Sequence, residues 1–398
     1  MFEKKNMKIL HIIPTYLPAY RYGGPIESVH GLNKALVSAG AEVTVYTTDI
    51  DGSESLNVPK GIPVMIDGVK VFYFKHSFPR SWFYSLDMSR ALAKHAAEFD
   101  VIHITSVFLA VSWLGARFAR KFRKPYVISP RGSLMREPLG KKSLKKKIYL
   151  ALIEKMNLKN AAAIHFTVPA EEGEYREAGL PLKCALTIPN SIDIQSLGIG
   201  DGKIFRQKLG IGPDRKIVLS LGRLSWKKGF DTLVPAFVEV AKAVPSAILV
   251  IAGGDDEQYK KVITQMIEEN GLRERVIFAG PISRDQKSSA YAASDVFVLP
   301  SYSENFGMVV AEAMGFGLPV VVTNGVGISN FVTEASAGLV VRKDPAELAS
   351  ALLWMFHNPE EAKEMGKRGE GLVRDRFSPS EIASAFMKEY ISLNKEYS

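Results

Sequence analysis

The stretch PSYSENFGMVVAEAMGFG, residues 300–317, decides the fold of this chain. A strand pattern ends just before it at residues 296–299, and a short turn then leads into a helix whose predicted N-cap is Asn305. The free amides of such a helix start favour an anion. Glu304 before the helix and Glu312 inside it would lie about 10 Å apart along the axis, too far to share a proton. That separation matches the span from sugar to ribose in a nucleotide sugar. The alternative, a buried helix with one solvated glutamate at each end, stays open on spacing alone.

Outward from this stretch, strand and helix patterns alternate along both halves of the 398 residues. The alternation predicts an α/β protein with two Rossmann-like, doubly wound domains that face each other across a crevice. We expect the N-terminal domain at residues 1–195, a Gly-rich linker at 196–202 and the C-terminal domain at 203–378. A last helix at 379–398 is expected to pack back on the N-terminal domain.

Charge is unevenly distributed between the two halves. Residues 1–195 hold 27 Lys and Arg against 17 Asp and Glu, whereas residues 196–398 hold 24 against 25. The basic excess, densest at residues 141–147, could attract anionic lipid or a phosphorylated acceptor, or could be a solvated helix face. No nucleic-acid-binding module is present, so nucleic acid is the least favoured partner.

The remaining composition narrows the class of protein. No apolar run has the length of a membrane span, and the first residues lead into a strand rather than a signal peptide, so a cytoplasmic protein is expected. The single cysteine, Cys184, excludes an intrachain disulfide and disfavours a cysteine metal site. Asp49 and Asp51 form an Asp-x-Asp pattern at a strand end, where turn chemistry is the better interpretation, so no metal is predicted.

Three motifs together carry a family resemblance: LSLGRLSWKKGFD at residues 219–231, PNSID at 189–193, and the pair Glu304 and Glu312. In this order and spacing they resemble the retaining nucleotide-sugar glycosyltransferases of family 4. The resemblance spans essentially the whole chain. It implies the GT-B fold and transfer of a hexose or N-acetylhexosamine from a nucleotide-diphosphate sugar, with a UDP- or GDP-sugar expected. The donor is a substrate, and no cofactor or metal is implied.

The resemblance also implies roles for particular residues. Arg223 and Lys228 would stabilise the leaving diphosphate, and Glu304 would contact the transferred sugar, so these three are the predicted catalytic residues. Glu312 would bind the ribose hydroxyls. The full predicted donor-binding set is Gly23, Gly24, Arg223, Lys228, Gly280, Pro281, Glu304, Asn305, Phe306, Gly307, Met308, Val309 and Glu312.

The chain departs from the family pattern after the strand at residues 126–129. Many members have a histidine near the reacting centre there, but this chain has SPRGS, with Arg131 in its place. Arginine cannot accept a proton at neutral pH, so its role would be electrostatic. Arg131 and His103 are the acceptor-side candidates, although a histidine in an apolar strand is more often a packed residue.

A subgroup of the family with an SPRG segment and a Lys-rich helix resembles this chain most. Its members act largely in surface-polysaccharide assembly. The resemblance therefore implies a saccharide or polyprenyl-diphosphate-linked acceptor and, through the basic N-terminal domain, a peripheral position at the inner face of the cell membrane.

Three other functions remain to be weighed. The same fold could serve a nucleotide-sugar epimerase or hydrolase, and a sugar-binding scaffold without activity would keep the architecture. The presence of Arg223, Lys228, Glu304 and Glu312 argues against the scaffold. A dinucleotide-dependent dehydrogenase is disfavoured, because no Gly-x-Gly-x-x-Gly follows the strand pattern at residues 7–14 or 216–221.

Overall fold

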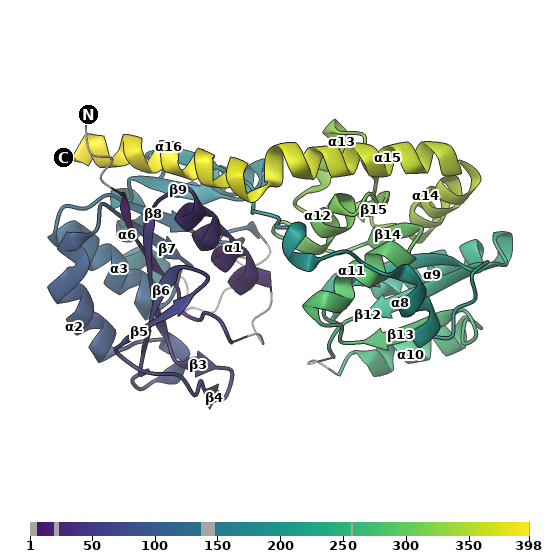
Figure 1. The fold of residues 1–398 in the computed structure, drawn as a ribbon, viewed down its shortest axis with the longest axis horizontal. Helices are drawn as coiled ribbons and strands as arrows, with labels where there is room; N and C mark the ends of the chain where they lie inside the picture. Colours follow the sequence, from purple (N-terminus) through teal and green to yellow (C-terminus); the bar gives the residue numbers. More distant parts are fainter. Residues whose placement is uncertain (1–5, 20–23, 137–147, 256–257, 398) are drawn as a thin grey trace. The chain divides into compact units, whose positions relative to one another are not determined.

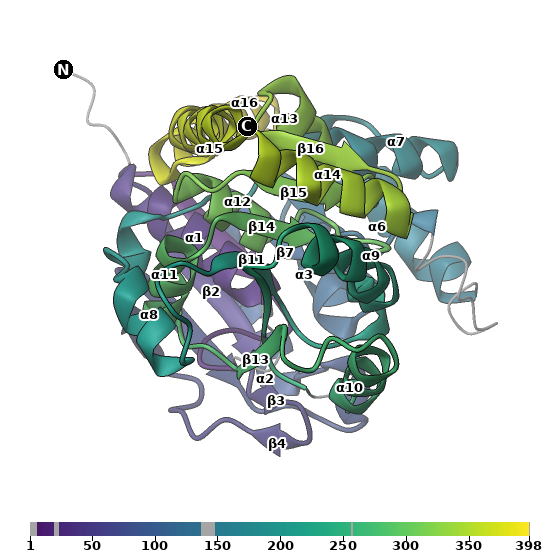
Figure 2. The ribbon, with the colours of Figure 1, turned by 90° about the vertical axis from the view of Figure 1, so that its right-hand side faces the viewer.

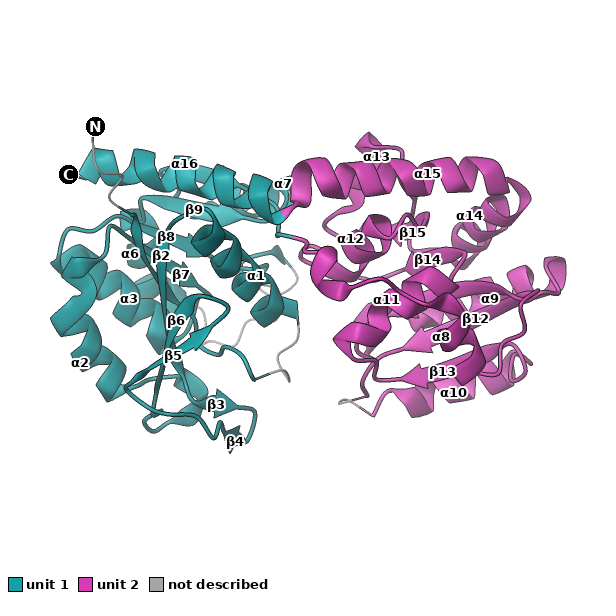
Figure 3. Cartoon of the chain, in the orientation of Figure 1, with its two compact units in different colours: residues 1–191, 379–398 teal, residues 192–378 magenta. Residues whose placement is uncertain are grey.

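The computed structural model describes residues 6–19, 24–136, 148–255 and 258–397. The chain divides into two compact units (Figures 1 and 3). Unit 1 comprises residues 1–191 and 379–398, and unit 2 comprises residues 192–378. Both are α/β units built on a predominantly parallel sheet, as the alternating pattern predicts.

Unit 1 has an eight-stranded sheet in the order β10-β9-β8-β7-β1-β2-β6-β5. All its strand pairs are parallel except the terminal pair of β5 and β6. Its strands are β1 (Lys8–Ile12), β2 (Glu42–Thr48), β5 (Pro63–Ile66), β6 (Val69–Phe74), β7 (Val101–Thr105), β8 (Tyr126–Ser129), β9 (Ala163–Phe166) and β10 (Ala185–Thr187), and β3 (Ile50–Asp51) and β4 (Glu54–Ser55) form a separate ribbon. The central strands β1, β7 and β8 are buried almost throughout, which fits a sheet covered on both faces.

The helices of unit 1 enclose two apolar clusters of the sheet. They are α1 (Gly24–Ser38), α2 (Leu86–His95), α3 (Ala110–Lys121), α6 (Lys155–Asn160), α7 (Pro169–Glu177) and α16 (Pro379–Tyr397), with short turns η2 (Arg80–Trp82), η3 (Ala96–Glu98) and η4 (Leu150–Glu154). One cluster joins α1 to α16 through buried side chains such as Leu32, Phe386 and Tyr390. The other joins α2, α3, α6 and α7. The last helix of the chain is therefore part of the core of unit 1.

Unit 2 has a six-stranded, fully parallel sheet in the order β13-β12-β11-β14-β15-β16. The strands are β11 (Lys216–Leu221), β12 (Ala247–Ala252), β13 (Val276–Gly280), β14 (Val296–Leu299), β15 (Val320–Thr323) and β16 (Gly338–Val341). The strand order reverses between β11 and β14, and ligands of open α/β sheets bind outside the carboxyl ends of strands at such a switch point.

The helices of unit 2 lie on both sides of its sheet. Figure 2 shows α8 and α11 on one side and α9 and α10 on the other. The helices are α8 (Gly202–Lys208), α9 (Phe230–Ala243), α10 (Lys260–Glu269), α11 (Arg284–Ala293), α12 (Met308–Gly315), α13 (Ser329–Glu334), α14 (Pro345–His357) and α15 (Pro359–Leu372), with η5 (Gln195–Leu197), η6 (Trp226–Lys228) and η7 (Val373–Phe377).

The segment predicted as a linker, residues 196–202, packs within unit 2. A Cβ at Gly200 would lie 2.1 Å from the carbonyl oxygen of Ser288, and one at Gly202 would lie 2.7 Å from that of Ala292. Both contacts are with the backbone of α11. The glycines are therefore required by close packing as well as by chain flexibility, and composition alone cannot separate these two uses of glycine.

Candidate active site

The loop after β11 brings Lys228 to the loop after β14. Residues Trp226–Lys228 form the turn η6, which ends at Gly229 in the left-handed region with φ 71°. The Lys228 Nζ lies 2.7 Å from the Glu304 Oε2, and the two side chains are only 16% and 27% exposed. A partly buried ammonium and carboxylate thus meet at the carboxyl edge of the sheet, at the switch point. Two of the three predicted catalytic residues are in direct contact.

Glycines allow the loops at this edge to approach backbone to backbone. A Cβ on Gly229 would lie 2.0 Å from the Pro300 carbonyl oxygen, and a Cβ on Gly253 would lie 1.8 Å from that of Gly222. The Lys228 Nζ in turn lies only 3.3 Å from where a Gly222 Cβ would be. A side chain at Gly229 or Gly253 would push the loops apart, and one at Gly222 would crowd the Lys228 side chain, so the three glycines set the position of the ammonium group.

The helix α12 begins two residues later than predicted. Its N-cap is Gly307, with φ 100°, and the expected N-cap Asn305 lies outside the helix. The backbone of Glu304 pairs with the segment after β15, because Gly327 donates to the Glu304 carbonyl and Ile328 to that of Phe306. This pairing keeps the chain extended through Phe306, and only the left-handed glycine turns it into the helix.

The start of α12 has backbone amides without an acceptor inside the helix. The amides of Met308 and Val309 lie in the first turn, where an α-helix has no internal acceptor. A Cβ on Gly307 would lie 2.8 Å from the Val326 side chain, so the site is closed on that side by the β15 loop. The Phe306 side chain is 3% exposed and packs on the Phe377 ring. Any contact of Phe306 with a ligand would therefore come from its backbone.

Glu312 lies in the second turn of α12 and is 6% exposed. Its carboxylate accepts a hydrogen bond from the Tyr291 hydroxyl at 2.7 Å and pairs with the Lys287 Nζ at 3.2 Å. Both partners belong to α11. Sequence analysis missed Lys287 and Tyr291; their spacing of four residues on one helix face was the available signal, but nothing in it pointed to Glu312.

The other predicted donor-binding residues of unit 2 lie at the same edge of the sheet. Arg223 is exposed on the loop after β11, and the next residue, Leu224, donates its amide to the Gly254 carbonyl after β12. Gly280 ends β13 with φ 72°, and Pro281 beside it is exposed. These loops follow neighbouring strands, so Arg223 can reach an anion above the carboxyl ends of β11 and β12.

Chemically, this edge suits a diphosphate with a polar group at each end. Cations at Lys228 and Arg223 and the amides of α12 can stabilise negative charge on a leaving group. Glu304 and Glu312, at the two ends of that region, can each accept hydroxyl hydrogen bonds. Within the described ranges, no cluster of three or more His, Cys, Asp or Glu side chains is arranged to hold a metal ion.

Unit 1 holds the predicted residues of the N-terminal domain. Gly23 lies outside the described residues, and Gly24 begins α1 at an exposed position. Arg131 follows β8 with φ 52°, and its guanidinium donates to the Asn190 side chain. Beside it, the Gly132 amide donates to the buried Glu171 carboxylate at 2.6 Å. Burial lowers the pKa of Arg131 to about 10, so it stays cationic at neutral pH.

His103 cannot contact an acceptor directly, because it is 0% exposed and both ring nitrogens are hydrogen-bonded. It stacks on His11 with ring centroids 4.3 Å apart, and His165 packs edge-on against it. His103 is therefore a packed residue of the sheet, as the apolar strand pattern favoured, and does not face an acceptor.

The unfolding free energy of unit 1 is expected to fall as the pH drops below about 6.5. Burial lowers the pKa of His11 and His165 to about 3 and that of His103 well below its usual value of 6.5. Below that value the unfolded chain binds protons that the folded chain does not, so the folded state loses up to about 1.4 kcal/mol per pH unit for each histidine. Denaturant unfolding between pH 7.5 and 5 measures the slope.

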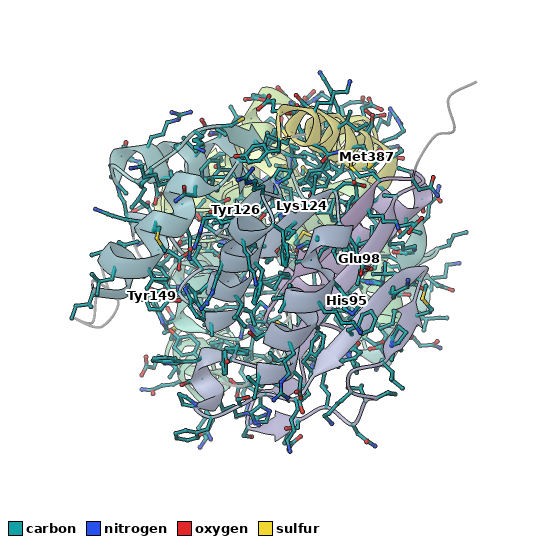
Figure 4. The ribbon with its side chains drawn as sticks, turned by 90° about the vertical axis from the view of Figure 1, so that its left-hand side faces the viewer. His95, Glu98, Lys124, Tyr126, Tyr149 and Met387 are labelled. Carbon is teal, nitrogen blue, oxygen red and sulfur yellow. The ribbon has the colours of Figure 1, made fainter. Side chains whose placement is uncertain are left out.

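The variant His103→Gln keeps one donor and one acceptor but removes one of the three histidines. The change in unfolding free energy with pH should therefore fall by nearly the contribution of one histidine, about 1.4 kcal/mol per pH unit. The matched control is His95→Gln, at an outer position of α2 where His95 pairs with Glu98 (Figure 4). An equal slope in wild type and His103→Gln would contradict the assignment of neutral buried histidines.

Comparisons with known proteins agree with this geometry. A sequence family described as "Glycosyl transferase 4-like domain" matches residues 23–191, and one described as "Glycosyl transferases group 1" matches residues 201–371. The two matches fall on the two units. The chain is a glycosyltransferase with the GT-B fold. It belongs to glycosyltransferase family 4.

Individual relatives have low sequence identity to this chain. An uncharacterized glycosyltransferase of Methanocaldococcus jannaschii is 27% identical over 86% of this chain and 87% of its own length. The D-inositol 3-phosphate glycosyltransferase of Nocardia farcinica is 31% identical, but the match covers 51% of this chain and 46% of that protein. For the latter, the chain thus matches less than half of the relative.

Solved structures share the fold. Sucrose-phosphate synthase from Thermosynechococcus elongatus superposes with a TM-score of 0.77 at 24% identity, covering 98% of this chain and all of that one. Anabaena HepE in complex with UDP-glucose gives 0.76 at 20% identity, covering 97% of this chain and all of that one.

Proposed function

We propose that this glycosyltransferase transfers a hexose or N-acetylhexosamine, with retention of anomeric configuration, from a nucleotide-diphosphate sugar to a hydroxyl of a saccharide or lipid-linked saccharide. The observation that carries the proposal is the ion pair of Lys228 and Glu304 beside the first turn of α12. A UDP-sugar is the favoured donor, because HepE was solved with UDP-glucose and a trehalose-6-phosphate enzyme of E. coli with UDP-2-fluoro glucose.

The proposed chemistry assigns one task to each group. The diphosphate lies at the amides of Met308 and Val309, where Lys228 and Arg223 stabilise the charge that develops on the β-phosphate as the glycosidic bond breaks. Glu304 holds the sugar and Glu312 the ribose. The departing phosphate accepts the proton of the attacking hydroxyl, so neither carboxylate is needed as a base.

Donor binding is expected to raise the melting temperature of the protein. A ligand at a hundred times its dissociation constant adds about 2.7 kcal/mol of stability, roughly 5–10 °C for a unit of this size. A thermal-shift series with UDP-glucose, UDP-N-acetylglucosamine, GDP-mannose and UDP alone measures the effect. Glu312→Gln should weaken the response to all nucleotides, whereas Glu269→Gln, at the end of α10, should leave it unchanged. A melting temperature that none of these nucleotides raises above that of the free protein would argue against the proposal.

Transfer is separated from hydrolysis and epimerisation by the need for an acceptor. Labelled donor incubated alone should release its sugar slowly, and an acceptor should accelerate the release of UDP. Hydrolysis or epimerisation that runs equally fast without acceptor would favour the alternative enzymes.

Contact with an anionic membrane surface is a further part of the proposal. Ile148, Leu152 and Met156 are 50%, 71% and 45% exposed around η4, directly after the basic segment 141–147, which lies outside the described residues. Tyr149 marks the place where η4 begins in Figure 4, on a face that also holds Lys124. Among the helices that the structure describes, none is long and apolar enough to cross a bilayer.

Cosedimentation with phosphatidylglycerol vesicles is expected to fall as salt rises from about 0.05 to 0.5 M, because the attraction between basic side chains and anionic headgroups is screened. Leu152→Ser should reduce the bound fraction, and pure phosphatidylcholine vesicles should bind little. Binding that is insensitive to salt would remove the electrostatic part of the proposal.

A further inference from the structure

A chain of buried hydrogen bonds runs across unit 1 from the last helix of the protein to two loops at the carboxyl ends of the sheet. The Tyr390 hydroxyl of α16 lies 2.5 Å from the His103 Nδ1, and the His103 Nε2 lies 2.6 Å from the Ser129 Oγ. The Ser129 Oγ lies 2.6 Å from the His165 Nδ1, and the His165 Nε2 lies 2.8 Å from the Ile188 carbonyl oxygen. All four side chains are at most 1% exposed.

The direction of every bond in this chain is fixed by its last acceptor. A carbonyl oxygen only accepts hydrogen bonds, so the His165 Nε2 must carry a proton and donate it to the Ile188 oxygen. In a neutral ring the His165 Nδ1 then has no proton, and it accepts a hydrogen bond from the Ser129 hydroxyl. The Ser129 oxygen then accepts from the His103 Nε2. The His103 Nδ1 is left as an acceptor, and Tyr390 must donate to it. Only one proton arrangement satisfies all four bonds.

The neutral state of the rings follows from their surroundings. Burial removes each ring from water and lowers its pKa, and the positive charge of Arg131 nearby lowers it further, so a proton on any of these stacked or adjacent rings is disfavoured. His11 has the opposite tautomer: its Nδ1 donates to the Asn33 Oδ1 at 2.8 Å, and its Nε2 accepts from the Thr105 hydroxyl at 2.8 Å. The two stacked rings thus hold their protons on different nitrogens.

Two members of this hydrogen-bond chain, Ser129 and Ile188, lie close in sequence to the pair of Arg131 and Asn190. Ser129 precedes Arg131 by two positions, and Ile188 precedes Asn190 by two, and the Arg131 guanidinium donates to the Asn190 side chain. The φ of 52° at Arg131 is costly for a residue with a side chain and persists only where the surroundings impose it. The bonds at Ser129 and Ile188 hold the two segments that meet in this pair.

We propose that Tyr390 is a positioning residue of the transfer reaction: through His103, Ser129 and His165, the last helix of the chain sets the geometry of Arg131 and Asn190 on the acceptor side. This inference rests on the proposed function. It assigns a role in the reaction to α16, which lies outside both matched family segments.

Nitrogen-15 NMR of the histidine rings tests the chain directly. The expected tautomers are Nε2–H for His103 and His165 and Nδ1–H for His11, all unchanged from pH 8 to pH 5. In Tyr390→Phe the His103 Nδ1 resonance should move toward that of an unbonded nitrogen, and the Arg131 Nε–H resonance should shift. Tyr397→Phe is the matched control, since this tyrosine is 39% exposed on the same helix. An Nδ1–H tautomer at His103, or an Arg131 resonance unmoved in Tyr390→Phe, would overturn the proposal.

Kinetics separate positioning from mere support of the fold. With UDP-glucose as donor and farnesyl-diphosphate-linked N-acetylglucosamine as acceptor probe, Tyr390→Phe should lower kcat about tenfold and leave the KM for UDP-glucose within twofold of wild type. His103→Gln, which keeps one donor and one acceptor, should retain more activity than His103→Leu. In an Arg131→Met background, Tyr390→Phe should add less than a twofold loss, because both changes act on one element.

The outcomes distinguish the two proposals. If the wild-type protein releases no UDP from any nucleotide sugar, the proposed function fails, and the NMR result alone decides whether Tyr390 positions Arg131. If the wild type is active and Tyr390→Phe matches Tyr397→Phe in kcat, the positioning role fails while the proposed function stands.

Discussion

Replacing Lys228 with alanine is expected to lower the kcat of sugar transfer by about 10- to 100-fold. A charge-assisted hydrogen bond to the leaving phosphate contributes roughly 1.5–3 kcal/mol, and each 1.4 kcal/mol is about a tenfold change in rate. The ammonium pairs with Glu304 in the free protein, so the donor must draw it toward the phosphate as charge develops there. The loss should therefore appear mainly in kcat. Steady-state release of UDP from UDP-glucose in the presence of acceptor measures it.

Lys227→Ala is the matched control for this variant. Lys227 lies in the same turn η6, and its ammonium lies over the Trp226 ring, 5.9 Å from the ring centroid. Its removal changes the net charge equally but should leave kcat within about twofold. If Lys228→Ala is as active as Lys227→Ala, Lys228 does not stabilise the leaving phosphate, and the interpretation as a sugar-binding scaffold without activity would be favoured.

The sequence predicted the two α/β units and the elements that carry the candidate donor-binding residues. Strand and helix periods gave two α/β units, and the motif around Lys228 together with Glu304 located the carboxyl edge of the second sheet. The pairing of these two side chains was not predictable, because it depends on the approach of Gly229 to Pro300, a contact between loops 71 residues apart in the sequence. A glycine in a loop indicates that the backbone can adopt unusual conformations there, but it does not indicate which segment packs against it.

Two other features of the structure differ from the sequence-based predictions for similar reasons: the N-cap of α12 and the surroundings of His103. Asn305 is a better N-cap than Gly307 by propensity, but pairing with the β15 loop holds residues 304–306 extended and overrides that preference. His103 appeared as an isolated histidine in a strand. Its partners come from β8, β9 and a helix 287 residues away, so no local pattern could reveal the chain of bonds that it joins.

Gly229→Ala is expected to be a severely damaging single-methyl change at the site. A left-handed conformation costs a residue with a Cβ about 1–2 kcal/mol. The new methyl group would in addition lie 2.0 Å from the Pro300 carbonyl oxygen, a backbone atom that cannot move without the whole loop. We expect a total loss of about 3–5 kcal/mol, the usual upper range for a point mutation. Separation of the loops would also part Lys228 from Glu304, so transfer should fall at least as far as in Lys228→Ala.

The steric part of this loss can be isolated with Gly271→Ala. Gly271, after α10 in the same unit, has φ 66° and no atom within 4 Å of its would-be Cβ. Its replacement should therefore cost only the conformational penalty, about 1–2 kcal/mol, and leave kcat unchanged. Denaturant unfolding of both variants measures the difference. Equal losses of stability would mean that the two loops accommodate a methyl group, and the backbone contact at Gly229 would then not be what holds Lys228 against Glu304.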